Sequence, residues 1–351
     1  MLNRIQATIP IIQAPMAGGV ATPELAAAVS NVGGIGFLAA GYGSASDLRS
    51  QIDHLESLTS RPFGVNVFVP QPSFVPARDL AAYTHQLEPE AQRYGVALGT
   101  NIPDEQQRWH DIVDHLVEHP VPIVSFTFGA PERALVDRLR RAGSYVVTTV
   151  TSISEALTAS HSGVDALCLQ GVEAGGHRAT FDPAAEPNSL TTIELLRAAG
   201  MHLDPRIPLI AAGGIATGQH ITNAFAARAS AVQLGTAFLR SIESGASPTH
   251  QAALVDPQLS ATVVTRAFSG RPARSLKNQF VANHGAAAPS AYPEVHYLTA
   301  PIRKAAATAD DPQALALWAG TEHSSAENRS AADIVTKLWN ARLQTCDTAT
   351  H

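Results

Sequence analysis

Of the fourteen histidines in the chain, His177 is the one whose surroundings indicate chemistry. It follows Gly175 and Gly176, which allow the backbone to approach a ligand closely. A neutral imidazole at such a turn can act as a general base at physiological pH. The alternative is a histidine that only supports the structure, and its place after a glycine turn favours the base. Glu173 of the same run is predicted to be a turn or surface carboxylate.

Two glycine motifs indicate a site for an anion. Gly213 and Gly214 follow one apolar run, and Gly235 and Thr236 lie within the next one. Glycine lets backbone N–H groups reach a phosphate, and the hydroxyl of Thr236 can add a donor. The alternative is that the glycines only make tight turns, but two such motifs in consecutive runs favour a phosphate site.

Two amide side chains, those of Asn66 and Gln170, lie in otherwise apolar runs. A buried amide is costly unless it is hydrogen-bonded, so each is either satisfied within the core or contacts a ligand. An amide offers both a donor and an acceptor, which suits the edge of a planar heterocycle such as an isoalloxazine ring. Both interpretations stay open on the sequence alone.

The elements that position these residues are predicted from hydrophobic patterning. Short, nearly continuous apolar runs recur along the chain, which is typical of parallel strands covered on both faces. They are Ile9–Met16, Ile35–Ala40, Phe63–Val69, Ile123–Phe128, Tyr145–Val150, Ala166–Gln170, Pro208–Ala212 and Ala231–Leu239. Helix-like segments lie between most of them, and one begins with Thr22 as N-cap and Pro23 at the first helical position.

Strands that alternate with helices in this way predict an α/β fold, the TIM (β/α)8 barrel, which usually has roughly 250 residues. The chief alternative is an open doubly wound sheet, because it obeys the same local rules. In a barrel the carboxyl ends of the strands carry the chemistry. The glycine motifs and His177 follow such ends, so we expect them to meet at one face.

Two stretches of the chain exceed a minimal barrel. Residues 70–122 are too long for one crossover, and we predict two helices there, Ala77–Tyr94 and Glu105–Glu118. The other stretch is everything after strand eight. For it we predict a helix over Ser247–Leu254, irregular chain over Arg266–Ala291 and a final helix over Asp333–Leu343.

We therefore predict three parts of the chain. Residues 1–240 form the barrel, and residues 241–310 form a smaller cap domain that contacts the substrate. Residues 311–351 form C-terminal helices that pack back on the barrel.

Composition narrows the class of protein. The chain has 351 residues, of which 45% are hydrophobic and 15% charged, and this excludes a disordered tail or linker. Twenty-four basic and thirty acidic residues give a net charge of −6, which favours neither nucleic acid nor an anionic membrane as a partner. We find no signal peptide or transmembrane run, so a cytoplasmic protein is expected.

Neither a disulfide nor a metal site is predicted. Cys168 and Cys346 provide no disulfide framework and no zinc spacing, and Cys168 falls inside a strand as a core residue. His115 and His119 are four residues apart, but no third ligand accompanies them.

In this combination the motifs resemble the nitronate monooxygenase family, formerly called 2-nitropropane dioxygenase. The segments that carry the resemblance are Gln13–Met16, Gly64–Phe68, Gln170–His177, Ala212–Ile215 and Gln233–Leu239. Three later segments look like the class I branch of the family, namely Glu243–Ser244, Tyr292–Pro293 and Leu317–Gly320.

The resemblance implies a TIM barrel with a cap domain that binds FMN without covalent attachment. Such enzymes oxidise alkyl nitronates with O2 to a carbonyl compound and nitrite, and some accept neutral nitroalkanes. His177 matches the catalytic histidine, which would take the α-proton of a neutral nitroalkane. The positions that match the family's flavin-binding residues are Met16, Asn66, Gln170, Gly175, Gly213, Gly214, Gln233, Gly235 and Thr236.

One position departs from the family pattern. Ala179 stands where the family commonly has glycine, and a positive φ there would cost an alanine about 1 kcal/mol. In the tail, a cation near the pocket would help to bind an anionic substrate. The candidates are Lys277, Arg303 and Lys304, and His250 is also expected to face the pocket.

Two other functions fit the same motifs. A flavin-dependent enoyl-acyl carrier protein reductase or an NAD(P)H:quinone reductase would share the barrel and the histidine motif, and rapid reduction of the flavin by NADH would identify it. A barrel that binds flavin without turnover is the third possibility. His177 in its glycine turn argues against that one.

Overall fold

The barrel predicted from the strand pattern is confirmed. The computed structural model describes residues 5, 7–72 and 75–347, with side chains up to Arg342. Eight parallel strands follow one another in the order β1-β9-β8-β6-β5-β4-β3-β2. A parallel bridge between Ile12 and Ile35 joins the two ends of the sheet, so the open doubly wound sheet is excluded. The strands are β1 (Ile11–Gln13), β2 (Gly36–Ala39), β3 (Phe63–Phe68), β4 (Ile123–Thr127), β5 (Tyr145–Val150), β6 (Ala166–Gln170), β8 (Leu209–Ala212) and β9 (Ala231–Leu234).

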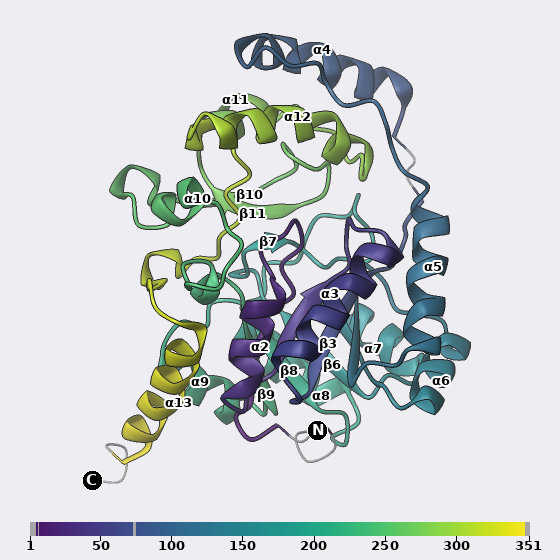
Figure 1. Cartoon of the computed structure of the whole chain (residues 1–351), viewed down its shortest axis with the longest axis vertical. Helices are drawn as coiled ribbons and strands as arrows, with labels where there is room; N and C mark the ends of the chain where they lie inside the picture. The colour runs from purple at the N-terminus through teal and green to yellow at the C-terminus, as the bar shows by residue number, and fades with distance from the viewer. Residues whose placement is uncertain (1–4, 6, 73–74, 348–351) are drawn as a thin grey trace.

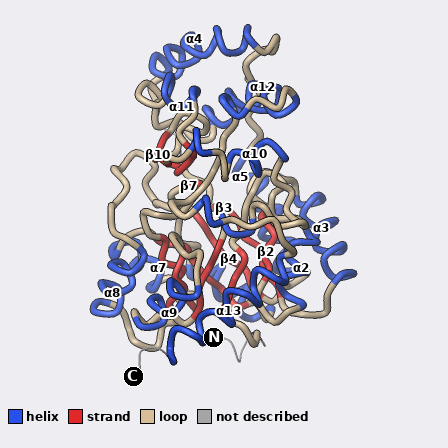
Figure 2. The backbone as a smooth tube through the Cα atoms, turned by 90° about the vertical axis from the view of Figure 1, so that its left-hand side faces the viewer, coloured by secondary structure: helices blue, strands red, loops and turns tan. Residues whose placement is uncertain are grey.

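Helices cover the outside of the barrel (Figures 1 and 2). They are α2 (Pro23–Asn31), α3 (Ala45–Leu58), α5 (Glu105–Glu118), α6 (Arg133–Ala142), α7 (Ile153–His161), α8 (Thr192–His202), α9 (Gly218–Ala226) and α13 (Ala331–Asp347). Several of these helices begin after a residue whose side chain caps the first turn. Thr22 caps α2, Ser44 forms a capping box with Asp47 in α3, and Thr191 forms one with Glu194 in α8. The final helix α13 packs against α2 and α9.

The interior of the barrel is a closed apolar cluster, separate from the layer between strands and helices. Phe37, Ile123, Val147, Cys168 and Ile210 are among its members. Burial raises the pKa of the Cys168 thiol to about 12, so the thiol stays neutral and inert at physiological pH. Cys168 is thus a core residue, as the sequence predicted.

The strands β1 and β9 are several residues shorter than their predicted apolar runs. Strand β1 ends before Pro15, which has no N–H for a ladder bond. Strand β9 ends at Leu234, because the chain turns at Gly235 into a short 3₁₀-helix, η1 (Thr236–Phe238). The glycine motif therefore lies where the last strand gives way to a helical turn.

A smaller cap lies over the carboxyl ends of the strands (Figure 1). Its elements are α4 (Ala77–Arg93), β7 (Gly176–His177), α10 (Pro248–Ala253), η2 (Pro257–Leu259), β10 (Thr262–Thr265), β11 (Ala273–Leu276), α11 (Gln279–His284), α12 (Glu294–Thr308), η3 (Pro312–Ala314) and η4 (His323–Ser325). The strand β7 pairs with β11, and β11 pairs with β10, all antiparallel.

The domain boundaries given above stay a prediction, but the apolar contacts show which segments pack together. A second apolar cluster unites the cap, and it includes Tyr83 and Leu87 of α4 as well as Leu315 and Leu317. Helix α4 therefore packs with the cap although it lies between β3 and β4 in sequence.

The prediction of irregular chain over Arg266–Ala291 is wrong. This stretch contains β11 and α11, the latter capped by Asn278, whose side chain accepts from the N–H of Val281. The partners of β11 come from β7 and β10, so no local pattern could indicate it.

Among the described residues, the helices are too short or too polar to cross a bilayer.

Candidate active site

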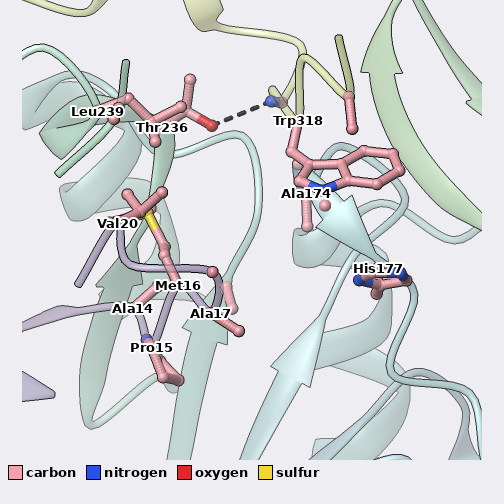
Figure 3. A pocket seen from close by; sticks show the side chains of 18 of the residues that line it. Ala14, Pro15, Met16, Ala17, Val20, Ala174, His177, Thr236, Leu239 and Trp318 are labelled. Carbon is pink, nitrogen blue, oxygen red and sulfur yellow. Dashed lines mark hydrogen bonds between the residues drawn. The ribbon is translucent and has the colours of Figure 1, made fainter. Parts of the chain in front are cut away.

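One cavity of about 650 Å³ lies between the strand ends and the cap. Every residue predicted to bind the cofactor or to act in catalysis lines it: Met16, Asn66, Gln170, Gly175, His177, Gly213, Gly214, Gln233, Gly235 and Thr236. Figure 3 shows His177 and Trp318 on one side of this pocket and Met16 on the other. The structure thus brings together residues that lie in or just after β1, β3, β6, β7, β8 and β9, while the role of each stays a prediction.

The glycine motifs form one wall of the cavity. Gly213 and Gly214 have φ angles of +109° and +66°, which only glycine adopts without strain. In the described part of the chain, the N–H groups of Gly213, Gly214 and Gly235 donate to no protein acceptor. Free backbone donors at a cavity wall are what a phosphate group needs.

The hydroxyl of Thr236 is positioned beside this wall. Its Oγ1 accepts a hydrogen bond of 3.0 Å from the N–H of Gly320, drawn as a dashed line in Figure 3. Because the oxygen already accepts that bond, the hydroxyl proton stays available to an anion in the cavity. Gly175 has a packing reason to be glycine, since a Cβ there would lie 2.4 Å from the nitrogen of Gly320.

The amide of Asn66 is satisfied inside the protein. Its Nδ2 donates to Ser125 Oγ at 2.8 Å and to Thr127 Oγ1 at 2.9 Å. Only 1% of Asn66 is exposed, although it contributes to the cavity wall. Of the two interpretations left open by the sequence, the satisfied core amide therefore describes the contacts seen here.

Gln170 positions the turn that carries His177. Its Nε2 donates to the carbonyl of His177 at 3.0 Å, and its Oε1 accepts from the N–H of Ala179 at 2.9 Å. The amide thus bridges both sides of the histidine. Ala179 is not among the described residues with positive φ, and it is fully buried, so the strain considered for an alanine at this position is absent.

The imidazole of His177 lies against an aromatic wall of the cavity. Its Nε2 is 2.8 Å from the hydroxyl oxygen of Ser269. Its ring centroid is 5.2 Å from that of Trp318, 5.9 Å from Phe128 and 6.1 Å from Tyr292. Burial, reinforced by the guanidinium groups of Arg271 and Arg303, lowers the pKa of His177 to about 3. The ring is therefore neutral at physiological pH, as a base must be.

The structure also shows the contacts of Glu173 and His250, which the sequence analysis had considered. Glu173 accepts hydrogen bonds from the backbone N–H of Thr192, at 3.0 Å to Oε2, so it acts as the turn carboxylate that was predicted. His250 lines the cavity, and its Nε2 is 3.1 Å from the carbonyl oxygen of Trp318.

Of the three cations predicted near the pocket, Arg303 and Lys304 line the cavity and Lys277 does not. Lys277 is exposed at the end of β11 instead. Arg271, which was not singled out as a candidate, is fully buried with its guanidinium carbon 3.8 Å from the centroid of Phe128.

Sequence reasoning missed four residues of the cavity wall: Tyr42, Phe128, His296 and Trp318. Phe128 has a φ of +77°, a strained conformation for a bulky residue and a frequent mark of functional sites. Phe128 is the last residue of a predicted strand, and in a barrel this position indicates a residue of the active-site face. His296 stacks on Tyr42 with centroids 4.1 Å apart, a contact between distant segments that no local pattern reveals.

The buried histidines lead to a prediction about stability. Burial lowers the pKa of His250 to about 4, whereas an unfolded histidine titrates near 6.5. As the pH falls below about 6.5 the unfolded state binds the proton first, so the free energy of unfolding decreases by about 1.4 kcal/mol per pH unit for this group. His177 acts in the same direction.

Urea denaturation across pH 7.5 to about pH 5 measures this dependence. The variant His250→Asn is expected to show a shallower loss of stability with acid than the wild-type protein. Equal slopes for both proteins would contradict a neutral, buried His250.

This chain is similar to known proteins over nearly its whole length. The family model of nitronate monooxygenase matches residues 1–341. A probable nitronate monooxygenase of Staphylococcus aureus is 38% identical over 339 residues, covering 94% of this chain and 93% of that protein.

Solved structures point the same way. A nitroalkane oxidase from Streptomyces ansochromogenes superimposes with a TM-score of 0.96 at 45% identity, covering 100% of both chains. FabK from Thermotoga maritima superimposes with a TM-score of 0.78 at 28% identity, covering 99% of this chain and 97% of that one. With its barrel, its glycine wall and the histidine turn of β7, this chain belongs to the nitronate monooxygenase family of oxidoreductases.

Proposed function

We propose that the protein binds FMN and oxidises alkyl nitronates with O2, releasing nitrite and a carbonyl compound. The observation that carries the proposal is that free backbone donors at Gly213, Gly214 and Gly235 share one cavity with a neutral, half-buried His177. A cofactor whose phosphate binds these donors would therefore lie in the same cavity as an acid–base group, and a substrate could contact both.

The residues present suit FMN. The glycine wall and the hydroxyl of Thr236 would hold its phosphate, because they present donors that no protein group uses. Gln233 lines the cavity, and in the described structure its amide makes no hydrogen bond to protein, so it is free to bind a polar edge of the cofactor. When bound, FMN would supply the redox chemistry, taking electrons from the substrate and passing them to O2.

His177 is proposed to act on neutral nitroalkanes. A nitronate has already lost its α-proton and needs no base, whereas a nitroalkane must give that proton to a positioned group. Gln170 fixes the backbone on both sides of His177, and Ser269 contacts its Nε2, so the ring is held in one orientation. The rings of Phe128, Tyr292 and Trp318 lie around it.

Nitrite formation tests the proposal. The purified protein, loaded with FMN and mixed with a preformed alkyl nitronate in air, is expected to release nitrite and consume O2. FMN-loaded protein that forms no nitrite from any of several nitronates would contradict the assigned reaction.

A second candidate is a flavin-dependent reductase that uses a nicotinamide cofactor. It is favoured by the likeness to FabK from Thermotoga maritima, although the likeness to the nitroalkane oxidase is much closer in both TM-score and identity. Rapid bleaching of the flavin by NADH under nitrogen is the outcome that this candidate predicts.

A further inference from the structure

Arg303 of α12 is a cation of the cavity wall with an unused donor. Its Nη2 donates to the carbonyl of His296 at 2.7 Å, and its Nε donates to Thr299 Oγ1 at 3.2 Å. Its Nη1 donates to no group in the described structure, and it is not among the buried atoms that lack a partner. Since Arg303 lines the cavity, this remaining donor group is accessible from it.

No carboxylate balances the charge of Arg303. Within the described part of the chain, Arg303 forms no ion pair with an aspartate or glutamate. The nearby acid Glu105 is already paired with Arg108 and accepts a hydrogen bond from Tyr297. Arg303 is half-buried and has no partner anion, so an anion in the cavity would gain a charge-assisted hydrogen bond from it.

Two other polar side chains that line the cavity, those of Tyr42 and His296, carry no negative charge. Burial raises the pKa of Tyr42 to about 12, so its hydroxyl stays protonated. Burial and the charge of Arg303 lower the pKa of His296 to about 2, so that ring stays neutral. Arg271 adds positive potential, but it is sealed behind Phe128 and does not line the cavity. Arg303 is therefore the guanidinium that an anion in the cavity can touch.

We propose that Arg303 binds the anionic NO2 group of the nitronate, and that this contact makes the site select nitronates over neutral nitroalkanes. The nitronate group is planar and shares one negative charge between two oxygens, much as a carboxylate does, and a guanidinium matches that geometry. A neutral nitro group has no net charge, so it gains little from the same contact. This proposal rests on the proposed function, because it assigns a residue to the substrate of that reaction.

The test compares two variants of Arg303 with a matched control. Arg303→Met removes the charge, Arg303→Lys keeps it without the planar fork, and Lys277→Met removes a cation of the cap that lies outside the cavity. We expect Arg303→Met to lower kcat/KM for a nitronate by about 10- to 100-fold, mainly through KM. The value for the matching nitroalkane should fall by a smaller factor, through kcat, because its NO2 group becomes anionic only as the proton leaves. Arg303→Lys should fall between wild type and Arg303→Met, and Lys277→Met should behave as wild type.

A binding measurement separates this contact from a general loss of structure. Nitrate, a planar anion, is used as a competitive inhibitor of the wild type and of each variant, and thermal denaturation reports on folding. We expect nitrate to inhibit the wild type and Arg303→Lys, and to lose most of its effect on Arg303→Met.

The outcomes distinguish the two proposals. Wild-type protein that forms no nitrite from nitronates would remove the proposed function itself. If the wild type forms nitrite but Arg303→Met keeps the wild-type ratio of kcat/KM for nitronate to kcat/KM for nitroalkane, only the role of Arg303 would be overturned. If Arg303→Met fails to fold, Arg303→Lys decides. A higher KM for the nitronate and weaker nitrate inhibition, at an unchanged KM for the nitroalkane, would support the contact. Unchanged values for both substrates and for nitrate would overturn it.

Discussion

Replacing His177 by alanine is expected to lower kcat/KM for a neutral nitroalkane by about 10²- to 10⁴-fold while lowering that for the preformed nitronate by less than about tenfold. The difference arises because only the nitroalkane must lose a proton in the active site. With its pKa held at about 3, His177 is a weak base in the empty cavity. It accepts a proton readily only when the anion formed beside it offsets the new charge, so we also expect nitronates to be better substrates than nitroalkanes.

Steady-state rates with one nitroalkane and its nitronate, measured on the wild type and on His177→Ala, provide the comparison. His202→Ala serves as the control, because His202 is an exposed histidine at the end of α8. Equal losses on both substrates would assign His177 a structural role. Undiminished activity on the nitroalkane would show that another group takes the proton.

Replacing Gly235 by valine is expected to weaken FMN binding by about 10- to 100-fold without unfolding the protein. A Cβ at Gly235 would lie 3.4 Å from Ala14 Cβ and 3.7 Å from Met16 Sδ, which are ordinary contacts, and its φ of −109° suits any residue. The added methyl groups would instead fill space beside the free backbone donors. This position separates cofactor binding from folding better than Gly213 or Gly214, whose positive φ angles would strain a side chain.

Titration of the apoprotein with FMN, followed by flavin fluorescence, measures the effect. Gly200→Val is the matched control, because Gly200 lies near the end of α8 and a Cβ there meets only the flexible end of Arg228. Wild-type affinity in Gly235→Val would contradict a phosphate site at this wall. A large drop in the melting temperature of Gly235→Val alone would show that the residue serves folding.

The barrel and its glycine wall were predictable because their signals are local. Apolar runs such as Tyr145–Val150 match the observed strand residue for residue, and Gly213 and Gly214 mark a turn that needs positive φ. The parallel direction of the strands in a barrel then brings their carboxyl ends to one face.

The cap was less predictable, for physical reasons. Strand β11 exists through pairing with two segments distant in sequence, and α12 contains Pro301, which argues locally against a helix. The contacts of Arg303 with Thr299 and His296 depend on that helix. The sequence predicted Arg303 as one of three candidate cations near the pocket, but only the fold shows that Arg303 lines the cavity and Lys277 does not.

For the two amides, the sequence could not decide between a structural role and a ligand contact. Sequence alone left Asn66 and Gln170 either satisfied in the core or directed to a ligand. Their hydrogen bonds to Ser125, Thr127 and the His177 turn give each a structural partner. The flavin contacts that the family resemblance implies for both amides stay a prediction.

The most direct test of the account is the absorbance spectrum of the FMN-loaded protein under nitrogen, mixed in turn with an alkyl nitronate and with NADH. The account predicts that the nitronate reduces the flavin within the time of turnover, that admitting air restores its colour, and that NADH leaves it oxidised over the same period. Rapid bleaching by NADH with no change on adding the nitronate would contradict nitronate oxidation and assign the cavity to a reductase.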